Sequence, residues 1–377
     1  MTTSRAEAVD TELFDRLGDE YEQVVYCHDS PSGLKAIIAI HSTALGPALG
    51  GTRFYPYPSG LAALTDVLRL AKSMTYKSAL AGLDLGGGKA VIIGDPSADK
   101  TEALLRVYGQ FVDSLGGRYL TAEDVGTTQS DMDTIARETR CVTGTSPQLG
   151  GSGDPSEATA RGVYWSMRAT AAHLDGAPTL AGLHVVVSGV GKVGASLVPL
   201  LCADGAKVTV SDVDGRAVAL LTADPNLEVH AAPVASAHTI ECDIFAPCAL
   251  GAVLNPRTIP ELRCRAIVGA ANNQLETEKD AVRLAERSIL YVPDFVANAG
   301  GVINIADGLV GYDRDRAMAA VERISATTAE ILRLSAADGS TTVAAAESLA
   351  KARIGSAQRS KQIRSFHAPT RNDRRGN

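Results

Sequence analysis

The fold of this 377-residue chain is decided by the stretch His184-Val-Val-Val-Ser-Gly189-Val190-Gly191-Lys192-Val193-Gly194-Ala195. An apolar run at residues 184–187 enters the glycines, and a second run at residues 207–210 ends two residues before Asp212. A strand, a glycine turn, a helix and a second strand with an acid about 20 residues on are typical of a dinucleotide-binding βαβ unit. The sequence therefore predicts such a unit, with its helix beginning near Lys192.

Each glycine of this loop has a physical role. Gly189 allows the tight turn, Gly191 lets the backbone approach a pyrophosphate, and Gly194 lets the helix pack closely on the sheet. The helix N-terminus favours the phosphate charge. We expect residues 189–195 to bind NAD, with Asp212 accepting hydrogen bonds from ribose hydroxyls and repelling a 2′-phosphate. Two alternatives remain. Arg216 is close enough to Asp212 in sequence that NADP could be the cofactor, or the glycine turn could bind no ligand.

Both halves of the chain alternate strands with helices. In the second half, further short strands fit residues 243–245, 266–269 and 290–292, which predicts a parallel, doubly wound sheet. In the first half, strands are expected at 34–40 and 90–93, helices at 61–74 and 100–115, and the glycines in loops. A Ser-, Pro- and Gly-rich linker at 146–155 leads into a helix at 157–173. Two further helices are expected at 313–337 and 343–354.

These patterns predict an α/β protein of two domains. We expect a substrate-binding α/β domain at residues 1–145 and a Rossmann NAD-binding domain at 146–335. A C-terminal helix at 336–356 would return to the first domain, so that the C-terminal helices pack between the two. Residues 357–377 are rich in basic side chains and form a tail that we expect to be disordered.

Composition excludes several classes of protein. The chain has 43 acidic and 36 basic residues, a net charge of −7 and 45% hydrophobic residues, which is ordinary for a globular protein. It contains no apolar run long enough for a membrane span, no apolar leader and no basic face for nucleic acid. The six cysteines lack C-x-x-C spacing and the histidines lack metal-ligand spacing, so we expect reduced structural thiols in the cytoplasm and no metal site.

A second glycine motif, Gly86-Gly87-Gly88-Lys89, lies in the first half. It is not a phosphate loop, because Leu83 and Ala90 stand where that motif needs Gly and Ser or Thr. Three glycines instead leave space beside the ammonium of Lys89, and apolar neighbours predict that it is partly buried. Burial lowers the pKa of a lysine toward neutrality, where it acts as a base.

Two further polar residues accompany Lys89. Lys77, expected at or just beyond the end of the helix at 61–74, would form an anion site with Lys89 and help to lower its pKa. A solvated surface lysine is the alternative. Asp124 follows an expected strand at 118–121, where loops build sites, and a helix N-cap is an equal alternative.

At this point the sequence resembles the glutamate/leucine/phenylalanine/valine dehydrogenases. The resemblance covers roughly residues 20–355 and is closest to the leucine and valine branch. Its motifs are Gly86-Gly-Gly-Lys89, Gly46-Pro-Ala-Leu-Gly-Gly-Thr-Arg53, Ala122-Glu-Asp-Val-Gly-Thr127, Ala246-Pro-Cys-Ala-Leu-Gly251, Gly269-Ala-Ala-Asn272-Asn273 and Asn298-Ala-Gly-Gly-Val-Ile-Asn304.

The resemblance implies reversible oxidative deamination of an L-amino acid, with NAD as cofactor. Lys77 would bind the substrate carboxylate, Lys89 would act as general base on water, and Asp124 would exchange protons with the amino group. Asn272 and Asn273 would face the junction of cofactor and substrate, with roles that are not separable from sequence. The two domains would close over the substrate, and the family fold implies a homo-oligomer built from dimers.

The resemblance also places residues around the substrate side chain. These are Leu49, Gly50, Ala122, Val302 and Ile305. Apolar liners exclude glutamate and favour valine, leucine or isoleucine. The segment 293–298 also resembles phenylalanine dehydrogenases, which keeps phenylalanine as an alternative substrate. A non-catalytic NAD-binding regulatory protein is a third alternative, which intact Lys77, Lys89 and Asp124 disfavour.

Overall fold

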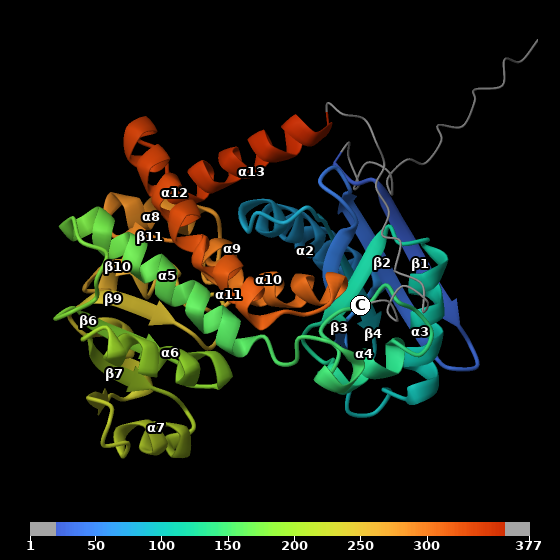
Figure 1. Ribbon diagram of the computed structural model, residues 1–377, viewed down its shortest axis with the longest axis horizontal. Coiled ribbons are helices and arrows are strands. Elements are labelled where there is room, and N and C mark those ends of the chain that lie inside the picture. The colour runs from blue at the N-terminus through green and yellow to red at the C-terminus, as the bar shows by residue number, and fades with distance from the viewer. Residues whose placement is uncertain (1–19, 359–377) are drawn as a thin grey trace, which may run out of the picture.

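The computed structural model describes residues 20–358 and folds them into two lobes, each built around one β-sheet (Figure 1). Within this range the first sheet has five strands and the second has six. The expected two-domain α/β fold is therefore confirmed. The basic tail expected at 357–377 lies almost entirely outside the described residues.

The first sheet has the strand order β1-β2-β4-β3-β5. Its strands are β1 (Gln23–Asp29), β2 (Leu34–Ser42), β3 (Ala48–Tyr55), β4 (Gly86–Ile93) and β5 (Tyr119–Glu123). The pairs β1–β2 and β2–β4 are antiparallel, whereas β3 runs parallel to both β4 and β5. The sequence pattern did not predict β1 or β3. Strand β3 is buried along most of its length and contains Gly50 and Gly51, so it shows no alternation of polar and apolar residues.

Three helices accompany this sheet: α2 (Gly60–Leu80), α3 (Glu102–Ser114) and α4 (Gln129–Ile135). Ser59 caps α2, and Leu64 and Val67 of its apolar stripe pack with Ile37 on β2 and Val91 on β4. The expected end of this helix at residue 74 was wrong. The apolar stripe is interrupted by Thr75 and Ser78, yet the helix continues, and Lys77 lies inside its last turn.

The glycines of the Gly86-Gly87-Gly88-Lys89 motif lie inside strand β4, not in a loop as expected. The reason is close packing on both sides of the strand. A Cβ added to Gly87 would lie 2.0 Å from the backbone nitrogen of Thr75 on α2, and one on Gly88 would lie 2.9 Å from the ring of Tyr119. The glycines therefore let α2 and β5 approach the strand that carries Lys89.

The second sheet has the order β11-β10-β9-β6-β7-β8, and all its pairs are parallel. Its strands are β6 (His184–Ser188), β7 (Lys207–Ser211), β8 (Val229–Ala231), β9 (Cys242–Pro247), β10 (Cys264–Ile267) and β11 (Leu290–Tyr291). Helices α6 (Lys192–Ala203), α7 (Gly215–Thr222) and α8 (Lys279–Glu286) connect them, together with 3₁₀ turns η2 (Val234–Thr239) and η3 (Ile259–Glu261). The predicted doubly wound parallel sheet is confirmed, and only the short β8 was not predicted.

The remaining helices join the two lobes. A 3₁₀ turn, η1 (Pro147–Leu149), precedes the long α5 (Ser156–Asp175). After the second sheet come α9 (Asp294–Ala297), α10 (Gly300–Asp307), η4 (Gly308–Val310), α11 (Arg314–Glu322), α12 (Ile324–Asp338) and α13 (Thr342–Gln358). Within the described part of the chain, no helix is both long and apolar enough to cross a membrane.

The single helix expected at 313–337 was wrong, because the chain bends at Arg323 between α11 and α12. The boundary between the two cores lies within α12, because its first residue, Ile324, still packs in the first core. Val321 on α11 packs with the first sheet, whereas Ile331 on α12 packs with the second. Helix α10 also packs against the first core, through Val302 and Ile303.

Candidate active site

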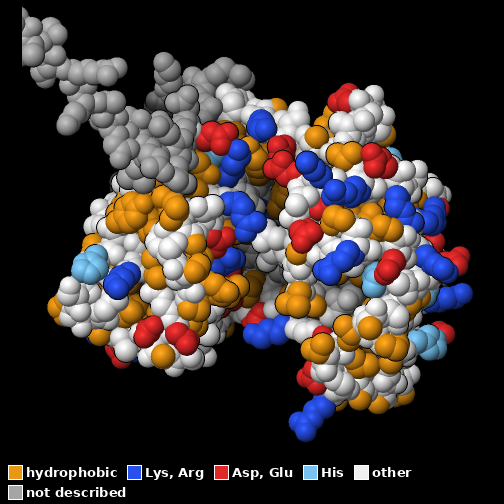
Figure 2. Space-filling view, turned by 180° about the vertical axis from the view of Figure 1, so that it is seen from behind, with side chains coloured by type: hydrophobic (Ala, Val, Ile, Leu, Met, Phe, Trp, Pro, Cys, Tyr) orange, Lys and Arg blue, Asp and Glu red, His pale blue; other side chains and the backbone are white. Residues whose placement is uncertain are grey.

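A cleft of about 680 Å³ lies between the two lobes. Figure 2 shows the molecule hollowed there, with side chains of both charges along the hollow. The cleft gathers predicted residues from both halves of the chain. Its lining includes Lys77, Lys89, Asp124, Leu49, Gly50, Ala122, Val302, Ile305, Lys192, Val193, Asn272 and Asn273. The other predicted cofactor residues, Gly189, Val190, Gly191, Gly194, Ala195 and Asp212, lie beside the cleft at the ends of β6 and β7 and the start of α6.

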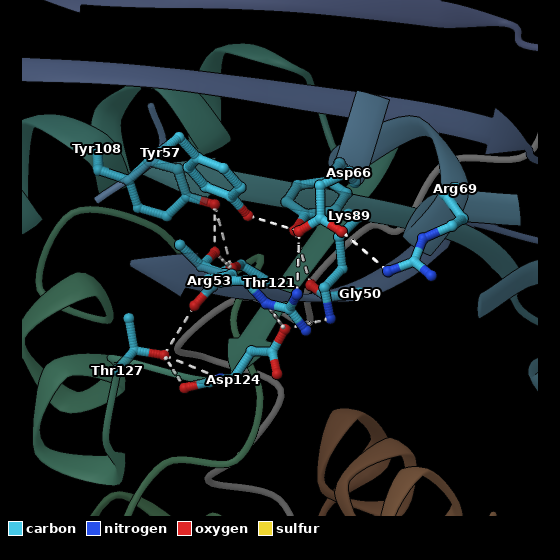
Figure 3. A network of polar contacts seen from close by, with 12 residues as sticks. Gly50, Arg53, Tyr57, Asp66, Arg69, Lys89, Tyr108, Thr121, Asp124 and Thr127 are labelled. Carbon is cyan, nitrogen blue, oxygen red and sulfur yellow. Dashed lines mark hydrogen bonds and ion pairs between the residues drawn. The ribbon is translucent and has the colours of Figure 1, made fainter. Parts of the chain in front are cut away.

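Lys89 and Asp124 form an ion pair at the cleft floor, with Nζ 2.5 Å from Oδ2 (Figure 3). Lys89 is 7% exposed, which confirms its predicted burial. Asp124 directly follows β5, and its N–H donates to Thr127 Oγ1 at 2.9 Å. The helix N-cap is Thr128, so the alternative that Asp124 caps α4 is wrong.

Burial acts to raise the pKa of Asp124, but two cations outweigh it. Lys89 and the guanidinium of Arg53, whose Nε lies 3.4 Å from Oδ2, hold the pKa of this carboxyl below its usual value. Asp124 is therefore a carboxylate at neutral pH. Such a group accepts a proton from a cationic donor and returns it.

Lys77 extends from α2 into the same cleft, half-buried. Burial lowers its pKa to about 8, an effect that nearby Lys89 reinforces and that Asp294 opposes. The solvated alternative for Lys77 is therefore wrong. At neutral pH it places a positive charge, held away from bulk water, beside Lys89, and such a pair attracts a carboxylate.

The apolar part of the cleft comes from strands β3 and β5 and from helix α10. Leu49 is fully buried, and Ala122 and Val302 are 2% and 7% exposed. Ile305 completes this wall, and its carbonyl accepts a hydrogen bond from Thr143 Oγ1, which fixes the end of α10 to the first lobe.

The glycine loop has the geometry that its spacing predicts. Gly189 has a φ of +104°, and a Cβ there would lie 2.7 Å from the nitrogen of Ala249. A Cβ on Gly194 would lie 2.0 Å from the carbonyl oxygen of Gly189, whereas one on Gly191 would meet open space. Gly191 is the N-cap of α6 and has no side chain to satisfy the N–H groups that follow. The loop therefore offers an open, donor-rich site that fits a dinucleotide pyrophosphate.

Asp212 lies at the end of β7 and turns toward this loop. Its carboxylate accepts hydrogen bonds from the N–H of Val190 at 2.6 Å and from the N–H of Asp214 at 2.8 Å. These bonds fix the acid at the edge of the glycine turn, where a cofactor ribose would lie.

Sequence reasoning missed several cleft residues. Arg53, Met74, Asp294 and Asn298 line it, yet none was assigned a role. The amide of Asn298 donates to Asn272 Oδ1 at 2.8 Å, while Asn273 has a φ of +52°. The two asparagines therefore differ: a hydrogen bond from Asn298 fixes the side chain of Asn272, whereas the backbone of Asn273 forms the turn. Asp294 and Asn298 lie in the segment 293–298, which resembles phenylalanine dehydrogenases. That resemblance was the sequence signal that could have identified them.

Known proteins match this chain along nearly its full length. Residues 21–141 match the family model "Glu/Leu/Phe/Val dehydrogenase, dimerisation domain", and residues 150–219 and 219–359 match "Glutamate/Leucine/Phenylalanine/Valine dehydrogenase". The chain belongs to this family of amino acid dehydrogenases, as its motifs predicted. The fold and family together imply a nicotinamide cofactor.

Individual relatives are similar over most of their length. A leucine dehydrogenase of Bacillus cereus is 51% identical over 359 residues, covering 94% of this chain and 98% of that enzyme. A valine dehydrogenase of Streptomyces coelicolor is 54% identical over 347 residues, covering 90% and 93%. The crystal structure of an L-tryptophan dehydrogenase from Nostoc punctiforme has a TM-score of 0.81 at 41% identity, covering 92% of this chain and 99% of that one.

Proposed function

We propose that this protein catalyses the reversible, NAD-dependent oxidative deamination of branched-chain L-amino acids. The balanced reaction converts the amino acid, NAD⁺ and water into the 2-oxo acid, ammonium, NADH and a proton. One observation carries the proposal: Lys77, Lys89 and Asp124 converge beside an apolar wall, across the cleft from a dinucleotide loop. The leucine and valine dehydrogenases that are about half identical to the chain support the substrate class.

The residues divide the chemistry between them. Lys77 holds the substrate carboxylate, so that Cα lies between Lys89 and the cofactor side of the cleft. When bound, the nicotinamide supplies the acceptor for the hydride that leaves Cα. Lys89 acts as the general base and takes a proton from water as the water oxygen bonds to Cα of the resulting imine. Asp124 takes a proton from the substrate ammonium before the hydride leaves and returns it to the amino nitrogen once water has added. The C–N bond then breaks, the departing ammonia takes the hydroxyl proton and leaves as ammonium, and the proton held by Lys89 passes to solvent.

The second lobe selects the cofactor. Residues 189–195 cradle the pyrophosphate, Asn272 and Asn273 face the nicotinamide, and Asp212 accepts from the ribose hydroxyls. A carboxylate there repels a 2′-phosphate, which favours NAD over NADP. The side chain of Arg216 is exposed on α7, and its backbone N–H donates a hydrogen bond to Asp214 Oδ1 at 2.9 Å.

The apolar wall supports a branched substrate. Leu49, Gly50, Ala122, Val302 and Ile305 contribute no charge that would partner the side-chain carboxylate of glutamate, so a glutamate bound there would be desolvated without compensation. An aromatic substrate such as phenylalanine is the second candidate, because one of the similar solved structures is that of a tryptophan dehydrogenase.

We also propose how the chain is divided and assembled. Residues 1–145 form the substrate domain, 146–335 the NAD domain, and 336–356 the returning helix, since Arg353 on α13 donates to the carbonyls of Ala79 and Leu83. The family model that matches residues 21–141 is described as a dimerisation domain, which supports a homo-oligomer built from dimers.

A turnover assay tests the proposed function. Purified protein is mixed with valine or leucine and NAD⁺, and both NADH and the 2-oxo acid are measured. We expect the two products in equal amounts, with ammonium. Absence of turnover on every natural L-amino acid, with NAD⁺ bound normally, would leave only the regulatory alternative.

A further inference from the structure

A chain of alternating charges runs from the protein surface to the catalytic lysine (Figure 3). Arg69 Nη2 lies 3.2 Å from Asp66 Oδ1, and Asp66 Oδ2 lies 2.9 Å from Arg53 Nη1. Arg53 Nε is 3.4 Å from Asp124 Oδ2, which pairs with Lys89 at 2.5 Å. The two ends differ: Arg69 is exposed, whereas the side chains of Arg53, Asp66 and Asp124 are each less than one-fifth exposed.

The fold brings these charges together from four elements. Arg53 lies on β3, between β4 with Lys89 and β5, after which Asp124 follows. Asp66 lies on α2, the helix that also carries Lys77. Asp66 Oδ2 also accepts a hydrogen bond from Tyr57 Oη at 2.6 Å. The carboxylate that pairs with Arg53 is therefore fixed in place by a second partner.

We propose that Arg53 is a positioning residue for the reaction: its fixed charge holds Asp124 in place and returns it to the carboxylate form after each proton exchange with the amino group, while Lys89 gains and loses a proton. This inference rests on the proposed function, in which Lys89 is the general base. A half-buried carboxylate whose only cationic neighbour became neutral would take up a proton itself. Arginine stays protonated throughout the accessible pH range, so it supplies a partner that does not titrate.

The other charges around Asp124 cannot replace Arg53. Lys89 changes charge in the reaction, and Lys77, whose ammonium also acts on Asp124, is engaged by the substrate carboxylate. Glu123, the preceding residue, is an acid and acts in the opposite direction. Arg53 is therefore the non-titrating cation next to Asp124 among the described residues.

The experiment compares Arg53→Gln with Arg53→Lys, which keeps the charge. The pKa of Asp124 is followed by NMR of ¹³C-labelled aspartate carboxyls, assigned with Asp124→Asn, and kcat and KM are measured against pH. For Arg53→Gln we expect the pKa of Asp124 to rise by about one to three units. The acidic limb of kcat/KM should move with it, and kcat should fall more than tenfold while KM for the amino acid changes less. Arg53→Lys should restore most of both.

Two further variants keep the test decisive. Arg53→Gln combined with Asp66→Asn leaves no unpaired carboxylate at position 66, and it should show the same rise even if the single variant folds poorly. Arg69→Gln removes only the exposed end of the chain and should behave as wild type. An unchanged Asp124 pKa with kcat within twofold of wild type, an equal shift in Arg69→Gln, or no recovery in Arg53→Lys would each overturn the proposal. The carboxyl titration needs no turnover, so it stands apart from a failure of the proposed function.

Discussion

At the scale of single residues, the two cleft lysines differ in what surrounds their ammonium groups. Lys89 contacts a carboxylate at 2.5 Å, whereas Lys77 has its pKa lowered to about 8 by burial. A lysine that contacts a proton-accepting carboxylate is suited to proton transfer. A half-buried lysine without such a close carboxylate contact is suited to binding an anion. The environments thus support the two roles that we propose.

Replacing Lys89 separates catalysis from cofactor binding. In Lys89→Ala we expect kcat to fall by about 10²–10⁴-fold, the usual contribution of a general base. NAD affinity should remain nearly unchanged, because Lys89 lies on the first sheet and the glycine loop on the second. Turnover and a cofactor titration measure the two effects, with Lys72→Gln as a surface-lysine control. A variant that keeps half of wild-type turnover would contradict the role of Lys89.

The lowered pKa of Lys77 predicts how substrate binding depends on pH. Below pH about 8 its ammonium is charged and holds the substrate carboxylate, and as pH rises through this value the charge is lost. The Kd of a branched 2-oxo acid, measured by calorimetry, should therefore rise by up to about tenfold per pH unit above 8. In Lys77→Gln the Kd should be weak and nearly constant with pH. A wild-type Kd that stays flat from about pH 7 to 9.5 would refute this role.

At the scale of secondary-structure elements, the contact between α2 and β4 sets the distance between the two lysines. Gly87 makes this contact possible, because no side chain fits between the strand and Thr75. In the second lobe, three glycines and Asp212 shape the loop before α6, which we propose binds the dinucleotide.

A methyl group at Gly87 should separate α2 from β4. We expect Gly87→Ala to lower the free energy of unfolding by about 3 kcal/mol, the upper range for overpacking, and to raise KM for the amino acid as Lys77 moves. Gly60→Ala is the matched control, since a Cβ there meets open space at the start of α2. Denaturant unfolding of both variants checks the effect, and equal stabilities would contradict this view of the motif.

We expect cofactor choice to be set by the residues directly after β7. Asp212→Ser combined with Val213→Arg should move the ratio of kcat/KM for NADP over NAD upward by about 10–100-fold, because charged hydrogen bonds to the ribose are lost and a phosphate partner is gained. Serine keeps an acceptor for the N–H of Val190. Val213→Arg alone serves as the control. Equal use of both cofactors by the wild-type protein would show that Asp212 does not select NAD.

The sequence predicted the second lobe better than the first, for physical reasons. Residues 184–212 carry local signals, since the strand, glycine turn and acid lie within one βαβ unit. By contrast, the glycines of β4 read as a loop because their partners, Thr75 and Tyr119, are distant in sequence. Arg53 was missed for the same reason: its role depends on Asp66 and Asp124, which lie on other elements.

At the scale of the whole molecule, the substrate pocket belongs mainly to one lobe. Val302 follows the second sheet in sequence, yet it packs in the same core as Leu49 of the first sheet. The apolar wall therefore does not depend on where the second sheet lies, and we propose that closure of the lobes brings the cofactor side to it. Side-chain selectivity should thus be a property of this wall.

The most direct test of the account compares kcat/KM for competing amino acids at equal concentration with NAD⁺. Valine, leucine and isoleucine should be preferred and only partly distinguished, because each methylene is worth about 1–3 kcal/mol in an apolar pocket. Phenylalanine should be slower by at least about tenfold, and glutamate should be rejected far more strongly because its carboxylate would be desolvated. If phenylalanine or glutamate gives the highest kcat/KM, the central claim of a branched-chain amino acid dehydrogenase is contradicted.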